Sequence, residues 1–128
     1  MKFEKEFASW LSKALSDEVN PEVSAFSFNL YEVADEAGVK FGIELIGAST
    51  FDLNDPDWAC DEVWEPKQRQ LLIPIAYSGE TWTDCLTKLK DLVIRSLAAP
   101  QDYAEQLKRV AGIGIGFVDG DLEIIWPA

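Results

Sequence analysis

The stretch that most constrains the fold is residues 111–126, AGIGIGFVDGDLEIIW, which predicts a β-hairpin. Asp119-Gly120 separates two apolar runs, and Asp-Gly favours a two-residue type I′ turn because both turn positions need a positive φ. That turn sets Ile115 opposite Ile124, and directly opposed residues point to the same side of a sheet. One predicted face therefore carries Ile113, Ile115, Phe117, Leu122, Ile124 and Trp126, and we expect this face to be buried. The other predicted face carries Gly114, Gly116, Glu123 and Ile125.

Periodic apolar residues predict the elements of the first half of the chain. Near the N-terminus they recur at the spacing of one helix face. These residues are Phe3, Phe7, Trp10, Leu11, Ala14 and Leu15. Residues 23–34 and 39–46 alternate apolar and polar side chains, as half-buried strands do. A four-residue loop between these strands sets Leu30 opposite Ile43 and Phe28 opposite Leu45, so the apolar faces match in an antiparallel hairpin.

The second half of the chain is predicted to hold a third strand and two helices before the closing hairpin. Residues 70–77 form the strand, and Pro74 predicts an edge position because proline cannot donate a ladder hydrogen bond. Thr81 and Asp84 have the spacing of a capping box at the start of a helix. The predicted buried face of that helix consists of Trp82, Cys85, Leu86, Leu89 and Val93. A short helix after Pro100 is predicted to pack through Tyr103, Leu107 and Val110.

This order of elements, αβββααββ, predicts one α+β domain over residues 1–128. Strands joined by hairpins and segregated from the helices favour a mainly antiparallel sheet, here of about five strands, over βαβ crossovers. The N-terminal helix and the two later helices would then pack on that sheet.

Composition narrows the classes of function. The net charge is −12, so nucleic acid is an unfavourable partner, because phosphate contacts need Lys and Arg. No apolar run approaches the ~20 residues of a membrane span. The acidic N-terminal stretch has no basic, signal-like start, and the two cysteines have no disulfide or metal spacing. We therefore expect a cytoplasmic protein that has no membrane partner.

Catalytic and cofactor motifs are missing from the sequence. The chain has no histidine, which removes Ser-His-Asp and Cys-His catalysis and most zinc sites. Gly112, Gly114 and Gly116 fail the dinucleotide fingerprint, because Phe117 stands where the third glycine of the motif belongs. Alternating glycines instead indicate a bare strand face that another segment can approach closely. We expect no enzymatic activity, no catalytic residue and no cofactor.

The acidic segment that begins at Asp52 does not predict a metal site. An EF-hand loop requires an oxygen ligand at its fifth position, glycine at its sixth and glutamate at its twelfth. The chain has Pro56, Asp57 and Val63 at those positions. A turn with solvated carboxylates explains the segment better, so we expect no bound metal.

The long irregular connection of residues 47–69, called the acidic loop below, contains the strongest candidate for a functional site. Residues 51–66 have six acids and no base, interleaved with aromatic residues. Two interpretations stay open: the aromatic side chains plug the core beneath the loop, or they anchor a basic partner whose Arg and Lys pair with the carboxylates. The candidate partner-binding residues are Asp52, Asp55, Asp57, Trp58, Asp61, Glu62, Trp64 and Glu65.

The chain resembles the small acidic immunity proteins of bacterial polymorphic toxin systems. The resemblance lies in length, in α+β order, and in the segment DWACDEVW followed by the closing GFVDGDLEI. It implies neutralisation of a cognate toxin, often a basic nuclease. The functional prediction is a binding protein of inhibitor type with a basic protein partner. The alternatives are a small-molecule-binding protein or small enzyme with a pocket over Gly114 and Gly116, and a structural or assembly subunit. The sequence does not predict the oligomeric state.

Overall fold

The fold is an α+β arrangement, as predicted, built on a mixed sheet of six strands. The computed structural model describes residues 2–16 and 18–127. The helices are α1 (Lys2–Ser16), the 3₁₀ helix η1 (Pro56–Cys60), α2 (Ile75–Ser78), α3 (Trp82–Leu97) and α4 (Asp102–Leu107). The strands are β1 (Ala25–Glu36), β2 (Val39–Ala48), β3 (Glu62–Trp64), β4 (Gln70–Pro74), β5 (Gly112–Phe117) and β6 (Glu123–Trp126).

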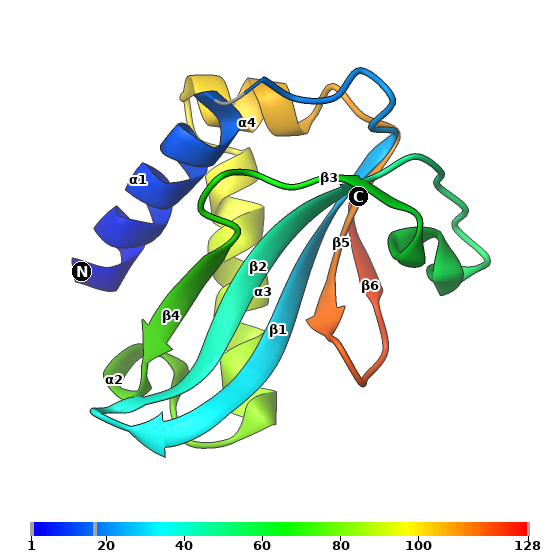
Figure 1. The fold of residues 1–128 in the computed structure, drawn as a ribbon. Helices are drawn as coiled ribbons and strands as arrows, with labels where there is room; N and C mark the ends of the chain where they lie inside the picture. The colour runs from blue at the N-terminus through cyan, green and yellow to red at the C-terminus, as the bar shows by residue number, and fades with distance from the viewer. Residues whose placement is uncertain (1, 17, 128) are drawn as a thin grey trace.

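The sheet runs in the order β3-β2-β1-β5-β6, and β4 also pairs with β2 (Figure 1). Most pairings are antiparallel, but β1 and β5 run parallel. This parallel pair joins strands that the helices separate in the chain, and nothing in the local pattern of either strand predicts it. Pro74 ends β4, which pairs with β2 alone, so its predicted edge position is confirmed. Residues 75–77 of the predicted strand belong instead to α2, which ends at Ser78.

The first hairpin has the predicted register. Leu30 lies opposite Ile43 and Phe28 lies opposite Leu45. The turn is tighter than expected, since β1 and β2 extend until Glu36 pairs with Val39. Ala37 and Gly38 form this turn with φ values of 55° and 77°. A turn with two positive φ values therefore occurs here and not at Asp119-Gly120.

Helices α1 and α3 lie against one face of the sheet and enclose the main core (Figure 1). The predicted face of α1 is buried over its whole length. Thr81 caps α3 as predicted, because its Oγ1 accepts a hydrogen bond from the Asp84 amide at 3.2 Å. Cys85, Leu89 and Val93 are fully buried, but Trp82 is 55% exposed, so its predicted place in the core is wrong.

The closing hairpin differs from its predicted register. Ile113 does pair with Trp126, but a bulge follows, so that Ile115 faces Glu123 and Gly114 faces Ile124. The turn is wider than a two-residue turn, because β5 ends at Phe117 and β6 begins only at Glu123. Ile113 and Ile115 are buried as predicted. The bulge brings Ile125 into the main core, whereas Ile124 joins a second cluster on the other side of the sheet.

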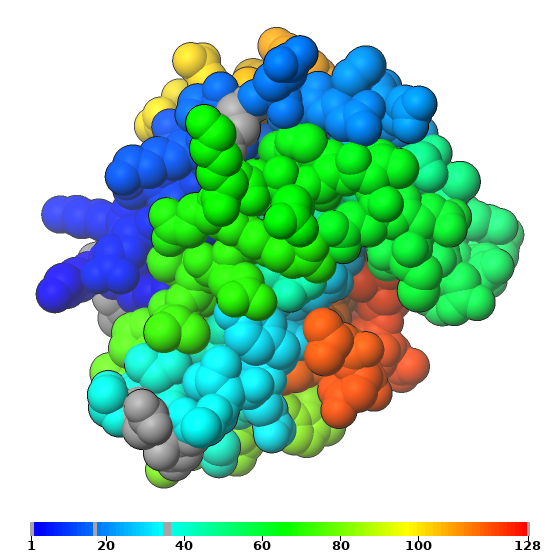
Figure 2. Space-filling view, in the orientation of Figure 1, coloured from blue at the N-terminus to red at the C-terminus, as the bar shows by residue number. Residues whose placement is uncertain are grey.

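That second cluster covers one end of the sheet face opposite α1 and α3. Its buried members are Ala25, Ile46, Ala48 and Trp58, and Phe51, Ala59, Leu122 and Ile124 pack against them. Residues 49–61 form the lid over this cluster and project from the body of the protein (Figure 2). The sheet is thus packed on both faces, with the smaller core under the acidic loop.

Candidate functional site

The tryptophans of the acidic loop lie inside the protein. Trp58 is 3% exposed and meets Phe51 edge-on, with ring centroids 5.3 Å apart. Trp64 is 8% exposed, packs edge-on against Phe26, and its Nε1 donates to the Glu18 carbonyl at 3.0 Å. Trp58 and Trp64 are therefore part of the core, and their predicted role as contact anchors is corrected. Of the two open interpretations, the core plug describes these side chains.

The aspartates of the same loop all face outward. The side chain of Asp52 accepts a hydrogen bond from the Asn54 amide at 2.8 Å, and that of Asp55 caps η1 by accepting from the Asp57 amide at 3.0 Å. Asp61 accepts from the Thr50 hydroxyl at 2.6 Å. Among the described residues no Lys or Arg forms an ion pair with these three carboxylates or with Asp57. The loop thus presents negative charge that no cation of residues 2–16 and 18–127 neutralises.

The two glutamates of the predicted site have a different role. Glu62 and Glu65 both pair with Arg69, whose second nitrogen also contacts Glu44 of β2 at 2.9 Å. The hydrogen bonds that Arg69 donates to these carboxylates, the one to Glu62 above all, raise the pKa of Arg69 well above its usual range. This cluster fastens the end of the acidic loop to the sheet, so Glu62 and Glu65 are less available to a partner than the aspartates.

The strand face over Gly114 and Gly116 is filled by the protein itself. Leu122 lies over Gly114, and the backbone of Asp121 lies over Gly116. The ring of Phe51 packs onto the neighbouring Gly112. The glycines therefore allow the close approach that their pattern indicates, and the approaching groups are side chains and backbone of the same chain. The predicted alternative pocket at this face is closed.

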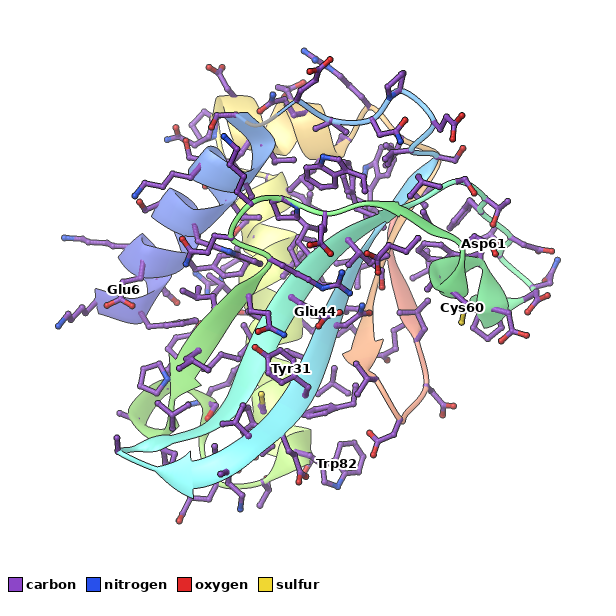
Figure 3. All side chains as sticks on the ribbon, in the orientation of Figure 1. Glu6, Tyr31, Glu44, Cys60, Asp61 and Trp82 are labelled. Carbon is purple, nitrogen blue, oxygen red and sulfur yellow. The ribbon has the colours of Figure 1, made fainter. Side chains whose placement is uncertain are left out.

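A cleft that the sequence did not predict lies between the start of α3 and the loop from β5 to β6. It holds about 510 Å³, and its apolar walls are Trp82, Leu86 and Phe117. The ring of Trp82 packs edge-on against that of Phe117, with ring centroids 6.1 Å apart. Phe117 packs edge-on against Phe41 in the core. Trp82 stands at the first turn of α3, beside the loop from β5 to β6 (Figure 3). Helical periodicity cannot distinguish Trp82 from the buried residues of α3, because all of them lie on the same face of the helix.

The polar lining of this cleft is almost entirely carboxylate. Its charged residues are Glu32, Asp119, Asp121 and Glu123. Glu123 pairs with Lys90 at 3.3 Å on the rim. Within the described part of the chain, no group donates a hydrogen bond to the side chains of Glu32, Asp119 and Asp121, and no cation forms an ion pair with them. The cleft thus combines exposed aromatic surface with negative charge, the combination that the sequence predicts for the acidic loop.

The two thiols differ in exposure. Cys60 is exposed at the end of η1, and Cys85 is buried in α3, where burial raises the pKa of its thiol to about 12. A thiol that stays protonated at neutral pH is a poor nucleophile. The described part of the chain also brings together no three acidic, cysteine or histidine side chains that could hold a metal ion.

No helix within residues 2–16 and 18–127 combines the length and the apolar character that crossing a membrane requires. Compared with known proteins, the chain matches no family model, no curated protein and no solved structure. The chemistry of the loop and of the cleft is therefore what points to a function.

Proposed function

We propose that this chain is a non-enzymatic binding protein whose partner is a basic protein, and that it acts in the cytoplasm as an inhibitor of the immunity type. The proposal rests on the solvent exposure of four carboxylates, those of Asp52, Asp55, Asp57 and Asp61. All four are exposed, and no described cation pairs with them. From the described residues, their side chains accept hydrogen bonds from loop amides and from the Thr50 hydroxyl.

Such a surface acts first on the rate of encounter. Carboxylates of one sign on a projecting loop attract a basic protein over roughly one Debye length, about 10 Å at 0.1 M salt. Steered association proceeds well above the ~10⁵–10⁶ M⁻¹s⁻¹ of an unsteered pair. The buried Trp58 keeps the loop in one conformation, so that the charges are in place before the partner arrives.

The inhibitor role rests on the resemblance to acidic immunity proteins and on the net charge of −12. A basic toxin such as a nuclease carries the charge that this surface complements. The small-molecule alternative loses its predicted location, because Leu122 and Asp121 occupy the space over Gly114 and Gly116. No particular contact favours the structural-subunit alternative.

Capture from a lysate of the native host tests the proposal. One bait is the wild-type chain, and the second carries Asp55, Asp57 and Asp61 changed to Asn. Asparagine keeps an acceptor oxygen for the loop hydrogen bonds and still caps a helix. The matched control changes three exposed glutamates elsewhere, Glu6, Glu22 and Glu80, to Gln, which alters the net charge equally.

We expect wild type and control to retain a basic protein, identified by mass spectrometry, that the triple Asn bait retains weakly. We also expect that protein to lose its toxic activity when the wild-type chain is added. An acidic captured protein, or equal capture by the triple Asn bait, contradicts the proposal.

A further inference from the structure

The cleft at Trp82 has the volume of a small binding site. Its volume of about 510 Å³ lies within the range of small-ligand sites, roughly 300–1,000 Å³. Leu86 and Phe117 supply apolar walls, and the ring of Trp82 packs edge-on against Phe117. Because Trp82 remains 55% exposed, much of the indole is free to be covered by an incoming group.

The charges of the cleft select the kind of group that enters. Every ionisable residue that lines it is acidic, and they come from three places: Glu32 from β1, Asp119 and Asp121 from the loop, and Glu123 from β6. Lys90 reaches Glu123 from outside the lining. An entering carboxylate or phosphate would meet uncompensated negative charge, whereas a cation would find acceptors on several sides.

We propose that this cleft binds an arginine side chain of the basic partner. A guanidinium is flat, stacks on aromatic faces and presents five N–H donors in a fixed plane. It can therefore cover the exposed indole of Trp82 while its edge donates to Asp119 and Asp121. Charge-assisted hydrogen bonds between the guanidinium and these carboxylates would fix the direction in which the partner's chain enters.

Other occupants fit these observations less well. A small metal ion needs ligands that converge on one point, and the described residues form no such group of three. Lysine carries a compact, strongly hydrated charge that gains less from an indole face. A second copy of this chain has a net charge of −12 and is repelled by an acidic cleft.

The inference rests on the proposed function for the source of the arginine, but its test needs no partner. The probe is the tripeptide acetyl-Gly-Arg-Gly-amide, added to ¹⁵N-labelled protein at constant ionic strength and followed by NMR. The chain has five tryptophans, and the indole N–H signal of Trp82 is the one that the Trp82→Phe variant lacks. Matched tripeptides carry lysine or citrulline, the uncharged isostere of arginine, at the central position.

We expect the arginine tripeptide to shift the Trp82 indole signal and the amides of residues 117–123 along a saturating curve. The citrulline tripeptide should leave these signals in place, and the lysine tripeptide should bind more weakly than the arginine one. Changing Asp119 and Asp121 to Asn should weaken arginine binding roughly threefold to tenfold, the size expected for two partly exposed ion pairs. Changing Asp55 and Asp57 to Asn, the same charge change on the distant loop, should leave it unchanged.

Three results would overturn the arginine pocket. They are equal shifts with citrulline or lysine, shifts spread over the molecule without saturation, and equal weakening by the Asp55 and Asp57 changes. A dimer that forms through the cleft, seen by light scattering and abolished by Trp82→Ala, would also overturn it. If the tripeptide does not bind, capture of a basic protein by the acidic loop is still expected. If no basic protein is captured, tripeptide binding is still expected, so the two experiments test the two proposals separately.

Discussion

The acidic loop and the cleft at α3 both combine carboxylates with a tryptophan, but the tryptophan is buried in the loop and exposed in the cleft. In the loop, Trp58 points inward and is 3% exposed, while the aspartates around it face solvent. In the cleft, Trp82 points outward and is 55% exposed, among carboxylates that leave it open. The cysteines are arranged in the reverse sense, since Cys60 of the loop is exposed and Cys85 of α3 is buried. Acidic residues mixed with aromatics therefore do not identify an interface until burial is known.

The difference follows from what each segment must cover. The loop crosses a sheet face that α1 and α3 do not reach, and Trp58 with Phe51 closes the apolar end of that face. Helix α3 already buries Cys85, Leu89 and Val93 against the sheet, so its first residue is not needed for the core. We conclude that the loop's tryptophan supports the fold and that the tryptophan of α3 is available for contact.

Replacing Trp58 with Ala should have the largest effect on stability. The change removes a fully buried aromatic side chain and should lower the free energy of unfolding by about 3–5 kcal/mol. Trp82→Ala should cost about 1 kcal/mol or less, as expected for a side chain that is half exposed. Urea unfolding of both variants measures the contrast.

Trp58→Phe is the matched control for this contrast. The Trp58 indole N–H has no hydrogen-bond partner among the described residues, so a phenyl ring should retain most of the stability. Equal losses for Trp58→Ala and Trp82→Ala would show that the two tryptophans contribute equally to the stability of the fold.

Gly112→Ala should have a smaller effect, which reports on the packing of the lid. The added methyl group would overlap the ring of Phe51, which lies over Gly112 and forms part of the lid. The ring can move only by loosening its edge-on contact with Trp58, so we expect a loss of about 1–3 kcal/mol, as for an overpacked core. An unchanged unfolding midpoint would mean that the lid is not packed as described.

Local signals in the sequence predicted the parts of the fold that depend on neighbouring residues. The face of α1, the cap at Thr81 and the pairing of Leu30 with Ile43 all follow from periodicity, side-chain chemistry or a short loop. Non-local features were missed. The parallel pairing of β1 with β5 joins distant segments, and the bulge in the last hairpin exchanges the environments of Ile124 and Ile125.

The candidate site was predicted in part. Charge is a surface property, so the exposed aspartates of the loop could be read from the sequence. The location of the tryptophans could not, because an apolar residue in an acidic segment fits a core plug and an interface equally well. Trp82 was misplaced because its spacing matches the buried residues Cys85 and Leu89, although its own side chain is 55% exposed at the start of the helix.

The two cysteines give a test that depends on pH. Burial raises the pKa of Cys85 to about 12, from 9.0 in its unperturbed state. Between these values the unfolded thiol loses its proton and the folded one keeps it, so stability should fall as the pH rises from 9 to 12. Cys85→Ala should make that decline shallower. Part of the decline should remain, because burial also raises the pKa of Tyr77, to about 12, and that of Tyr31.

Thiol labelling at neutral pH checks the same arrangement. A disulfide reagent should modify Cys60 in the folded protein and reach Cys85 only after denaturant is added. Rapid modification of both thiols would place α3 outside the core and remove the rigid base on which Trp82 stands.

Divalent metals should have the smallest effect of all. Neither the loop nor the cleft gathers ligands around one point, and we expect no metal requirement for folding or binding. The melting temperature with about 1 mM calcium, magnesium or zinc should equal that with a chelator, because a ligand stabilises only a folded state that binds it. A rise of more than a few degrees, abolished by changing Asp52 or Asp119 to Asn, would assign a metal to one of the two regions.

Steering by the loop's carboxylates is tested by the association rate constant of the captured partner, measured by stopped flow at increasing salt. Screening shortens the reach of the loop's carboxylates, from about 10 Å at 0.1 M to about 3 Å at 1 M. We predict that association of the wild-type chain slows at least tenfold over this range while dissociation changes little. The variant with Asp55, Asp57 and Asp61 changed to Asn should associate slowly already at low salt and respond weakly to more. An association rate that is indifferent both to salt and to the triple change would contradict the account.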